Sequence, residues 1–126
     1  MIFESLPERI QLMNIYKMNQ MKGGWFIGNF EPSVLKTTQF EIGILKHKKG
    51  EQWPKHKHKY AEEYNYIIEG QMTIQNTLLS SGDIFILNRG EIADPVFLED
   101  CVVIVVKVPS IPGDKIIIKE KNEFIQ

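Results

Sequence analysis

Short apolar runs separated by glycine, proline and charged residues make up most of this chain, and this pattern favours strands over helices. The segment Lys36–Lys46 alternates apolar and polar positions, as a half-buried strand does. Ile84–Leu87 and Cys101–Val108 are largely apolar runs of strand length, bounded by turn residues. Many short strands at close spacing predict an all-β sandwich or barrel.

The remaining segments complete this prediction. Tyr64–Ile68 and Met72–Ile74 are expected to form a hairpin around Glu69 and Gly70. Thr77–Ser81 is interpreted as the next connection. Glu8–Met18 fits a short helix and an irregular strand equally well, so both remain open. Further expected elements are a strand at Trp25–Phe30, a strand at Lys115–Lys119 and a frayed helical turn in the tail, Glu120–Gln126.

The composition is that of one globular domain. The chain has 126 residues, 43% hydrophobic and 25% charged, which gives room for a single core. We expect an N-terminal arm at 1–20, a barrel at 21–110 and a C-terminal segment at 111–126. The formal net charge of -1 provides no global field to attract nucleic acid. No apolar run has the length needed to span a bilayer, so neither nucleic acid nor membrane is an expected partner.

Cys101 is the only cysteine and opens an apolar run, which indicates a small buried hydrophobe rather than a reactive thiol. A lone cysteine cannot form an internal disulfide. The first residues lack the basic and apolar regions of a secretory signal. These features together favour a cytoplasmic location.

Two histidines and a carboxylate stand close together in the middle of the chain. His56 and His58 are one residue apart, so their side chains share one face if the segment is extended. Glu63 follows at the start of a β-branched, apolar stretch. Two imidazoles and one carboxylate can converge on a single cation, and with open coordination positions this set is associated with non-haem iron.

The same segment resembles the first motif of the cupin superfamily, G-x5-H-x-H-x3–4-E-x6-G. Glu62 fits the shorter spacing after the histidines, but only Glu63 is followed by the required six residues before glycine. The fixed positions of the motif are Gly50, His56, His58, Glu63 and Gly70. The resemblance implies a double-stranded β-helix, or jelly-roll barrel. It also implies a divalent metal (iron, manganese, zinc or nickel) held by His56, His58 and Glu63.

The second motif of that superfamily, G-x5-P-x-G-x2-H-x3-N, is only partly present. Gly82 and Gly90 are correctly spaced. Asn88 replaces the usual proline, Ala93 replaces the fourth metal ligand, and Phe97 replaces the final asparagine. Asp94 is the nearest substitute ligand. Strict alternation points it to the opposite face, so we interpret it as a turn or surface carboxylate.

The resemblance implies two alternative functions, and a structural or interaction protein that keeps the fold but uses no metal is a third possibility. The sequence leaves open whether any reaction is catalysed. One is a metal-dependent enzyme of carbohydrate metabolism, of the isomerase, epimerase or dioxygenase type. The other is a non-catalytic binding or sensor protein with a degenerate metal site, as the alanine at 93 suggests. In both cases the ligand is a small polar molecule, such as a sugar derivative or an anionic metabolite.

Lysines and aromatic residues surround the histidine segment. Lys55, Lys57 and Lys59 share the face opposite the histidines, where they suit a solvated edge or attraction of an anionic ligand. Trp25 and Trp53 could line a binding mouth or fill the core. Counting by twos from Glu63 places Asn65 and Ile67 on the inner face and Tyr64, Tyr66 and Ile68 on the outer face. That outer face requires a cover, either residues 9–18 or a second subunit, so we expect a homodimer.

Overall fold

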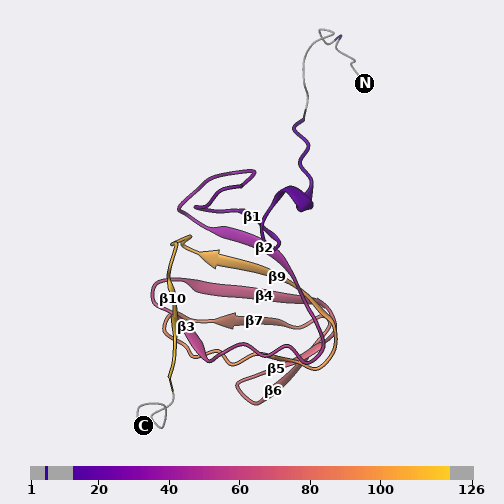
Figure 1. Ribbon diagram of the computed structural model, residues 1–126, viewed down its shortest axis with the longest axis vertical. Coiled ribbons are helices and arrows are strands. Elements are labelled where there is room, and N and C mark those ends of the chain that lie inside the picture. Colours follow the sequence, from indigo (N-terminus) through magenta and orange to yellow (C-terminus); the bar gives the residue numbers. More distant parts are fainter. Residues whose placement is uncertain (1–4, 6–12, 120–126) are drawn as a thin grey trace.

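Strands form nearly all the regular structure in the computed structural model, which describes Ser5 and residues 13–119 (Figure 1). Within these residues one 3-10 turn, η1 (Met18–Gln20), precedes ten strands. The strands are β1 (Trp25–Ile27), β2 (Glu41–His47), β3 (His56–His58), β4 (Glu62–Glu69), β5 (Gln71–Ile74), β6 (Thr77–Ser80), β7 (Ile84–Leu87), β8 (Val96–Phe97), β9 (Cys101–Val108) and β10 (Lys115–Ile117). The all-β prediction is confirmed.

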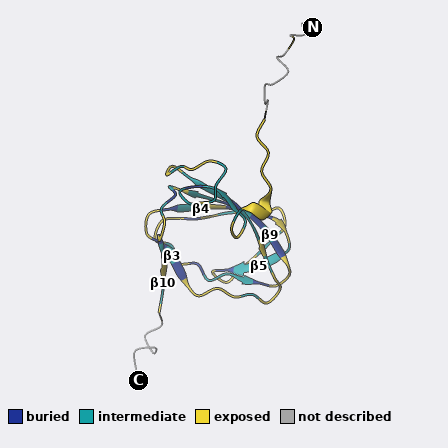
Figure 2. Ribbon diagram, turned by 45° about the horizontal axis from the view of Figure 1, so that its top comes forward, coloured by how far each residue is buried: buried dark blue, intermediate teal, exposed yellow. Residues whose placement is uncertain are grey.

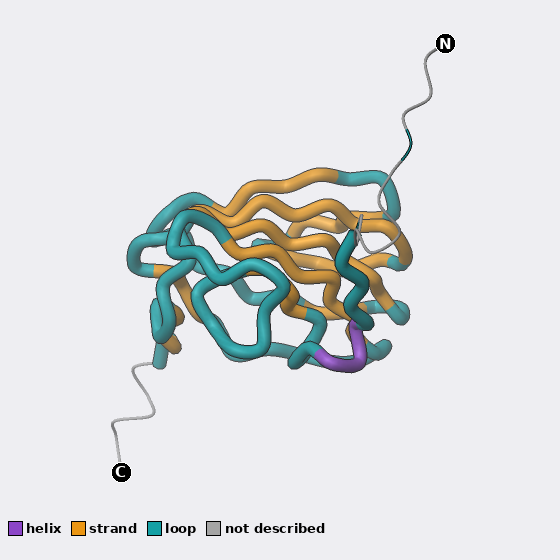
Figure 3. Tube along the Cα trace, turned by 90° about the horizontal axis from the view of Figure 1, so that it is seen from above, coloured by secondary structure: helices purple, strands orange, loops and turns teal. Residues whose placement is uncertain are grey.

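Five strands form the larger sheet in the order β1-β2-β9-β4-β7, with every neighbouring pair antiparallel. Figure 3 shows these strands side by side. The central strand β9 alternates as a sheet with one covered face requires. Cys101, Val103 and Val105 are buried, whereas Val102 and Ile104 are only half-buried. The buried set therefore defines the inner face of the barrel.

The opposite layer consists of two smaller sheets, β6-β5-β8 and β10-β3, which face the larger sheet in Figure 2. Gln75 and Asn76 join β5 to β6 with φ of 52° and 58°, the positive values that two-residue hairpin turns need. The prediction of Thr77–Ser81 as a connection is wrong. Thr77–Ser80 form β6, because their backbone pairs with β5 and Leu79 packs against the core.

The predicted hairpin around Glu69 and Gly70 is also wrong. β4 pairs with β7 and β9, whereas β5 pairs with β6 and β8. The chain therefore crosses from one layer to the other at Gly70, whose φ is +95°. A Cβ atom there would lie 2.3 Å from the backbone oxygen of Asp100. Glycine is required because it allows both the backbone conformation and this close approach.

Several expected boundaries differ from the observed ones. The strand predicted at Trp25–Phe30 ends at Ile27, and the one predicted at Lys115–Lys119 ends at Ile117. The strand predicted to start at Lys36 starts at Glu41. Residues 13–17 of the ambiguous segment are irregular and extend outward from η1, which lies beside the barrel (Figure 1). Met18 begins η1, whereas residues 8–12 and the tail at 120–126 lie outside the described residues.

The core lies between the two layers. Ile67 is fully buried there, and Asn65 is 4% exposed, whereas Tyr66 on the opposite face of β4 is 42% exposed. This agrees with the inner and outer faces predicted for β4. The buried apolar cluster consists of Ile67, Met72, Ile74, Leu87, Ala93, Phe97, Cys101, Val103 and Val105. Among the described residues, no helix combines the length and apolar character that crossing a bilayer requires.

Candidate functional site

A cavity of about 290 Å³ lies inside the barrel. Apolar side chains of both layers form most of its wall, including Met72, Phe85 and Val105. Its polar and charged lining residues are His47, His56, His58, Glu63, Asn65, Lys107 and Lys115. A largely apolar pocket with a few convergent polar groups is typical of a small-molecule site.

Strand β3 brings His56 and His58 to the cavity. The segment is extended, as predicted, so both imidazoles point to the same side and are only 7% and 5% exposed. β3 pairs with β10 on one side, with His58 opposite Lys115 and His56 opposite Ile117. On its other side, His56 forms a bridge with Ala93. Backbone pairing on both sides therefore fixes the direction of the two imidazoles.

Glu63 reaches the same cavity from the start of β4. Its Oε2 lies 3.4 Å from Nδ1 of His58, and its side chain is 13% exposed. Burial raises the pKa of the Glu63 carboxyl group, and the positive charge of Lys107 opposes that rise. Glu62 instead accepts a hydrogen bond from the hydroxyl group of Tyr64, on the outer face of the strand. Of the two neighbouring glutamates, Glu63 is the one that lines the cavity.

Both imidazoles are neutral at physiological pH. Burial lowers the pKa of His58 to about 4, and the nearby positive charge of Lys107 adds to this effect. Burial likewise lowers the pKa of His56. The low-dielectric surroundings disfavour the charged imidazolium form in each case. A neutral imidazole retains the lone pair that binding a metal requires.

The hydrogen bond of His56 determines which nitrogen carries its proton. Nδ1 lies 2.9 Å from the carbonyl oxygen of Pro54, and a carbonyl group can only accept. Nδ1 therefore donates its proton there, which leaves Nε2 as the atom with a free lone pair. Contacts of this kind fix the tautomer and orientation of histidines that bind metals.

The structure places the three predicted ligands in one cavity but does not assemble them into a closed ligand set. The ring centroids of His56 and His58 are 5.6 Å apart, and the ring planes are almost perpendicular, at 83°. Within the described part of the chain, no group of three or more His, Cys, Asp or Glu side chains forms a ready-made metal site. His58 and Glu63 are adjacent, and binding an ion would require the three side chains to move closer together.

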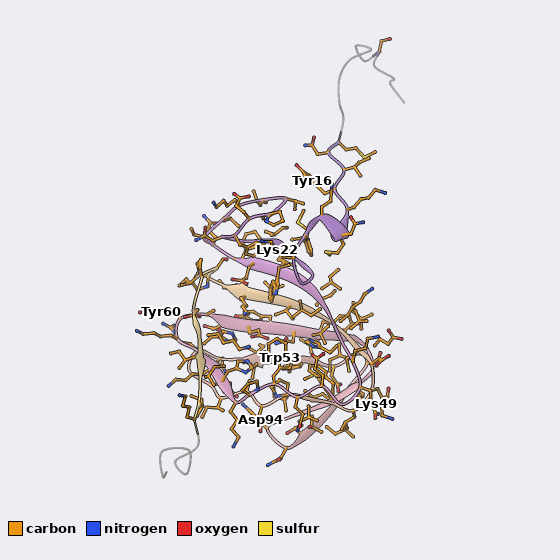
Figure 4. All side chains as sticks on the ribbon, viewed as in Figure 1. Tyr16, Lys22, Lys49, Trp53, Tyr60 and Asp94 are labelled. Carbon is orange, nitrogen blue, oxygen red and sulfur yellow. The ribbon has the colours of Figure 1, made fainter. Side chains whose placement is uncertain are left out.

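Ala93 lies directly beside this group. Its backbone exchanges hydrogen bonds of 2.9 Å and 2.8 Å with His56, and its side chain lines the cavity. A residue at 93 thus faces the same space as His56, but the methyl group of alanine offers no ligand. Asp94 accepts a hydrogen bond from the backbone N–H of Gln75 at 2.8 Å. Figure 4 shows Asp94 at the lower end of the barrel, consistent with its interpretation as a turn carboxylate.

Sequence reasoning missed His47, which also lines the cavity. Glu51 accepts hydrogen bonds from Nδ1 of His47 and, at 2.8 Å, from Nε1 of Trp53. The His47 ring stacks on Phe97 at a centroid distance of 4.0 Å. His47 pairs with Cys101, six residues along β9 from the partner of Glu63, or roughly 20 Å at strand rise. Its ring nevertheless lies 6.0 Å, centroid to centroid, from that of Trp53, which in turn lies 4.1 Å from Nζ of Lys115.

Sequence reasoning also missed Lys107 and Lys115, the two lysines that line the cavity. The lysines singled out from the sequence lie elsewhere: Lys55 and Lys59 are exposed, and Lys57 is half-buried on the face opposite the histidines. Alternation could have found Lys107, because it follows Val103 and Val105 at intervals of two on β9. Trp25 and Trp53 both line the cavity. Trp53 is 42% exposed, as expected at a binding mouth, whereas Trp25 also packs against the core.

No protein-family model and no curated protein matches the sequence. Solved structures do resemble the fold. An uncharacterised protein with a double-stranded β-helix domain from Klebsiella pneumoniae is 17% identical at a TM-score of 0.63, over 91% of this chain and 100% of that one. KdgF from Halomonas sp. is 24% identical at a TM-score of 0.54, over 60% of this chain and 74% of that one. The pirin YhhW from Escherichia coli, solved in complex with nickel(II), is 19% identical at a TM-score of 0.57, over 69% of this chain and 39% of that one.

The chain thus has a double-stranded β-helix fold, the fold that the resemblance of its first motif implied. At these identities the likeness concerns the fold alone, and a fold does not determine function.

Proposed function

We propose that this protein binds a divalent metal ion and a small polar ligand in the cavity of its barrel, with His56, His58 and Glu63 as the metal ligands. The observation that carries the proposal is a pair of neutral, buried imidazoles beside a carboxylate in a cavity of about 290 Å³. Burying polar groups is costly unless hydrogen bonds, an ion pair or a bound metal ion compensates the loss of water. Imidazole and carboxylate together suit iron, manganese, zinc and nickel.

The donor chemistry fits such an ion. Nε2 of His56 is free to bind, because the Pro54 carbonyl holds the proton on Nδ1. Metal binding would also favour the ionised form of Glu63, whose pKa is raised by burial. When bound, the ion would polarise a carbonyl or hydroxyl oxygen of the ligand as a Lewis acid or provide a site for dioxygen. Nickel in the Escherichia coli pirin is consistent with metal binding in this fold.

Within this proposal, we favour an enzyme acting on a small polar substrate, such as a sugar derivative. His47 supports a catalytic role because the Glu51 carboxylate holds a proton on its Nδ1, which leaves Nε2 able to accept a proton from a ligand. The alternative is a binding or sensor protein without turnover. Ala93 favours that alternative, because its methyl group, which lines the cavity, cannot act as a fourth ligand and the affinity for the ion is lower without one. In both cases we retain the cytoplasmic location expected from the single, buried Cys101.

Metal content separates this proposal from a metal-free protein. After loading with Mn(II), Fe(II), Ni(II) or Zn(II) and desalting, we expect about one ion per chain by elemental analysis. His56→Ala with His58→Ala should abolish uptake, and Glu63→Gln should weaken it. His47→Ala is the matched control, since it removes the third histidine of the same cavity and should retain the ion. Equal uptake by the double variant and the parent would show that the ligands are assigned wrongly.

We also propose that two copies associate through the outer face of the larger sheet. Tyr64, Tyr66 and Ile68 of β4 are each about 40% exposed, and Ile84 of β7 is 73% exposed. Contiguous apolar and aromatic surface of this kind is typical of interfaces. The described part of the N-terminal arm does not cover this outer face, since Tyr16 lies well above the barrel in Figure 4. Light scattering should show a dimer that Tyr66→Glu converts to a monomer. A parent protein that is monomeric at high concentration would refute this.

A further inference from the structure

Two lysines enter the cavity from neighbouring positions beside the proposed metal ligands. Lys107 of β9 is the cross-strand partner of Glu63, and Lys115 of β10 is the cross-strand partner of His58. Directly opposite residues of an antiparallel pair project to the same face of the sheet. Both lysines therefore line the same end of the cavity as His58 and Glu63.

Aromatic rings rather than carboxylates support these two ammonium groups. Nζ of Lys115 lies 4.1 Å from the ring centroid of Trp53, and Nζ of Lys107 lies 5.0 Å from that of Trp25. Cations are attracted to aromatic faces at such distances. Among the described residues, no carboxylate oxygen lies within 4.0 Å of either ammonium group. Each lysine thus keeps its hydrogen-bond donors available to a ligand.

The charges of the lining residues do not balance. The wall carries two lysines, Lys107 and Lys115, against one glutamate, Glu63. With histidines counted as neutral, the formal net charge of these groups is +1. Lys115 is half-buried, and burial and the charge of Lys107 both lower its pKa. One bound negative charge would neutralise the wall.

We propose that Lys107 and Lys115 form a recognition subsite for the carboxylate group of a small organic acid, with the rest of the molecule held between Trp25 and Trp53. A single carboxylate matches the net charge of +1. A phosphate dianion matches it less well and is more costly to remove from water into a largely apolar cavity. The inference rests on the proposed ligand-binding cavity but does not require its metal. A bound metal would increase the positive charge and tighten binding further.

The two tryptophans of the chain both line this cavity, so intrinsic fluorescence can report the binding. The probes are lactate and lactamide, which have nearly the same shape but differ in charge, and inorganic phosphate. Protein treated with EDTA is titrated first and zinc-loaded protein second. We expect lactate to change the fluorescence saturably in both forms, lactamide to be without effect, and phosphate to bind more weakly than lactate.

Variants identify the groups responsible. Lys107→Met and Lys115→Met should each weaken lactate binding about tenfold or more, whereas Lys115→Arg should largely retain it. Lys57→Met is the matched control, because its side chain lies on the outer face of β3, and it should bind lactate as the parent does. Lysine variants that bind lactate like the parent, or lactamide that binds as well as lactate, would overturn the subsite. So would a parent protein that does not respond to lactate, or phosphate that binds more tightly.

The tests of the lysine subsite and of the metal site can fail separately. Lactate binding that depends on the lysines but occurs in a protein unable to take up metal would retain the subsite and refute the metal site. Metal uptake by a protein whose lactate binding does not depend on Lys107 and Lys115 would support the metal site and refute the subsite.

Discussion

The buried imidazole of His58 makes a definite prediction about stability and pH. Its pKa is lowered from 6.5 to about 4 in the folded protein, chiefly because burial removes it from water. The unfolded chain therefore binds this proton more tightly than the folded one. The stabilising contribution is complete above the unfolded pKa of about 6.5 and is lost progressively as the pH falls from there toward 4.

The magnitude follows from the size of the shift. Each unit of pKa corresponds to about 1.4 kcal/mol, so lowering the pH from 7.5 to 4.5 should cost the metal-free protein roughly 2 to 3 kcal/mol through His58 alone. His58→Gln removes the titrating group while keeping a polar side chain of similar reach. Glu63 is present in both proteins, so its opposite pH dependence largely cancels in the comparison.

The assay is urea unfolding of both proteins at the two pH values, with EDTA present. The parent should lose roughly 2 to 3 kcal/mol more stability than His58→Gln on acidification. A difference between the two proteins that stays constant within about 0.5 kcal/mol would mean that His58 is solvated rather than buried, and the electrostatic account of the site would be refuted.

Three further predictions concern particular positions. Gly70→Ala should lower stability by more than ~2 kcal/mol, because its Cβ would meet the Asp100 oxygen at 2.3 Å. Gly113→Ala should cost only about 1 kcal/mol, because its surroundings are open; equal thermal shifts would contradict this. Asp114 accepts hydrogen bonds from the backbone of Tyr60 and Ala61 at 2.9 Å and 3.0 Å, so Asp114→Ala should cost about 1 to 3 kcal/mol in urea unfolding; an unchanged midpoint would refute it. Ala93→His should place a third imidazole beside His56 and tighten zinc binding by at least about tenfold in competition titrations; unchanged affinity would mean that position 93 does not face the ion.

Local pattern was enough to predict the inner and outer faces of the strands. Alternation alone separates Asn65 from Tyr66 and His56 from Lys57, because strand geometry imposes a period of two. Which strands pair with one another could not be predicted from local pattern. The hairpin expected at Gly70 fails because adjacent apolar runs can belong to different layers. The strand pairing shows that the chain changes sheets there, at the point where Gly70 approaches Asp100, 30 residues away.

The candidate site likewise combines residues that local sequence predicts with residues that only strand pairing brings together. His56, His58 and Glu63 are close in sequence, so their common location could be predicted. Lys107 and Lys115 come from strands at the end of the chain and reach the cavity only through cross-strand pairing with Glu63 and His58. His47 reaches it through β2 and is oriented by Glu51. Alternation along β9 points to Lys107 alone, whereas Lys115 and His47 carry no local signal and the tertiary structure is needed to find them.

The most direct test of a metal held by His56, His58 and Glu63 is an anomalous difference map from crystals grown with zinc and measured on both sides of the zinc absorption edge. Zinc bound as proposed should give one strong peak inside the barrel, about 2.0 to 2.2 Å from Nε2 of His56, a ring nitrogen of His58 and a carboxylate oxygen of Glu63. An empty barrel, or zinc found only on the surface, would contradict the account.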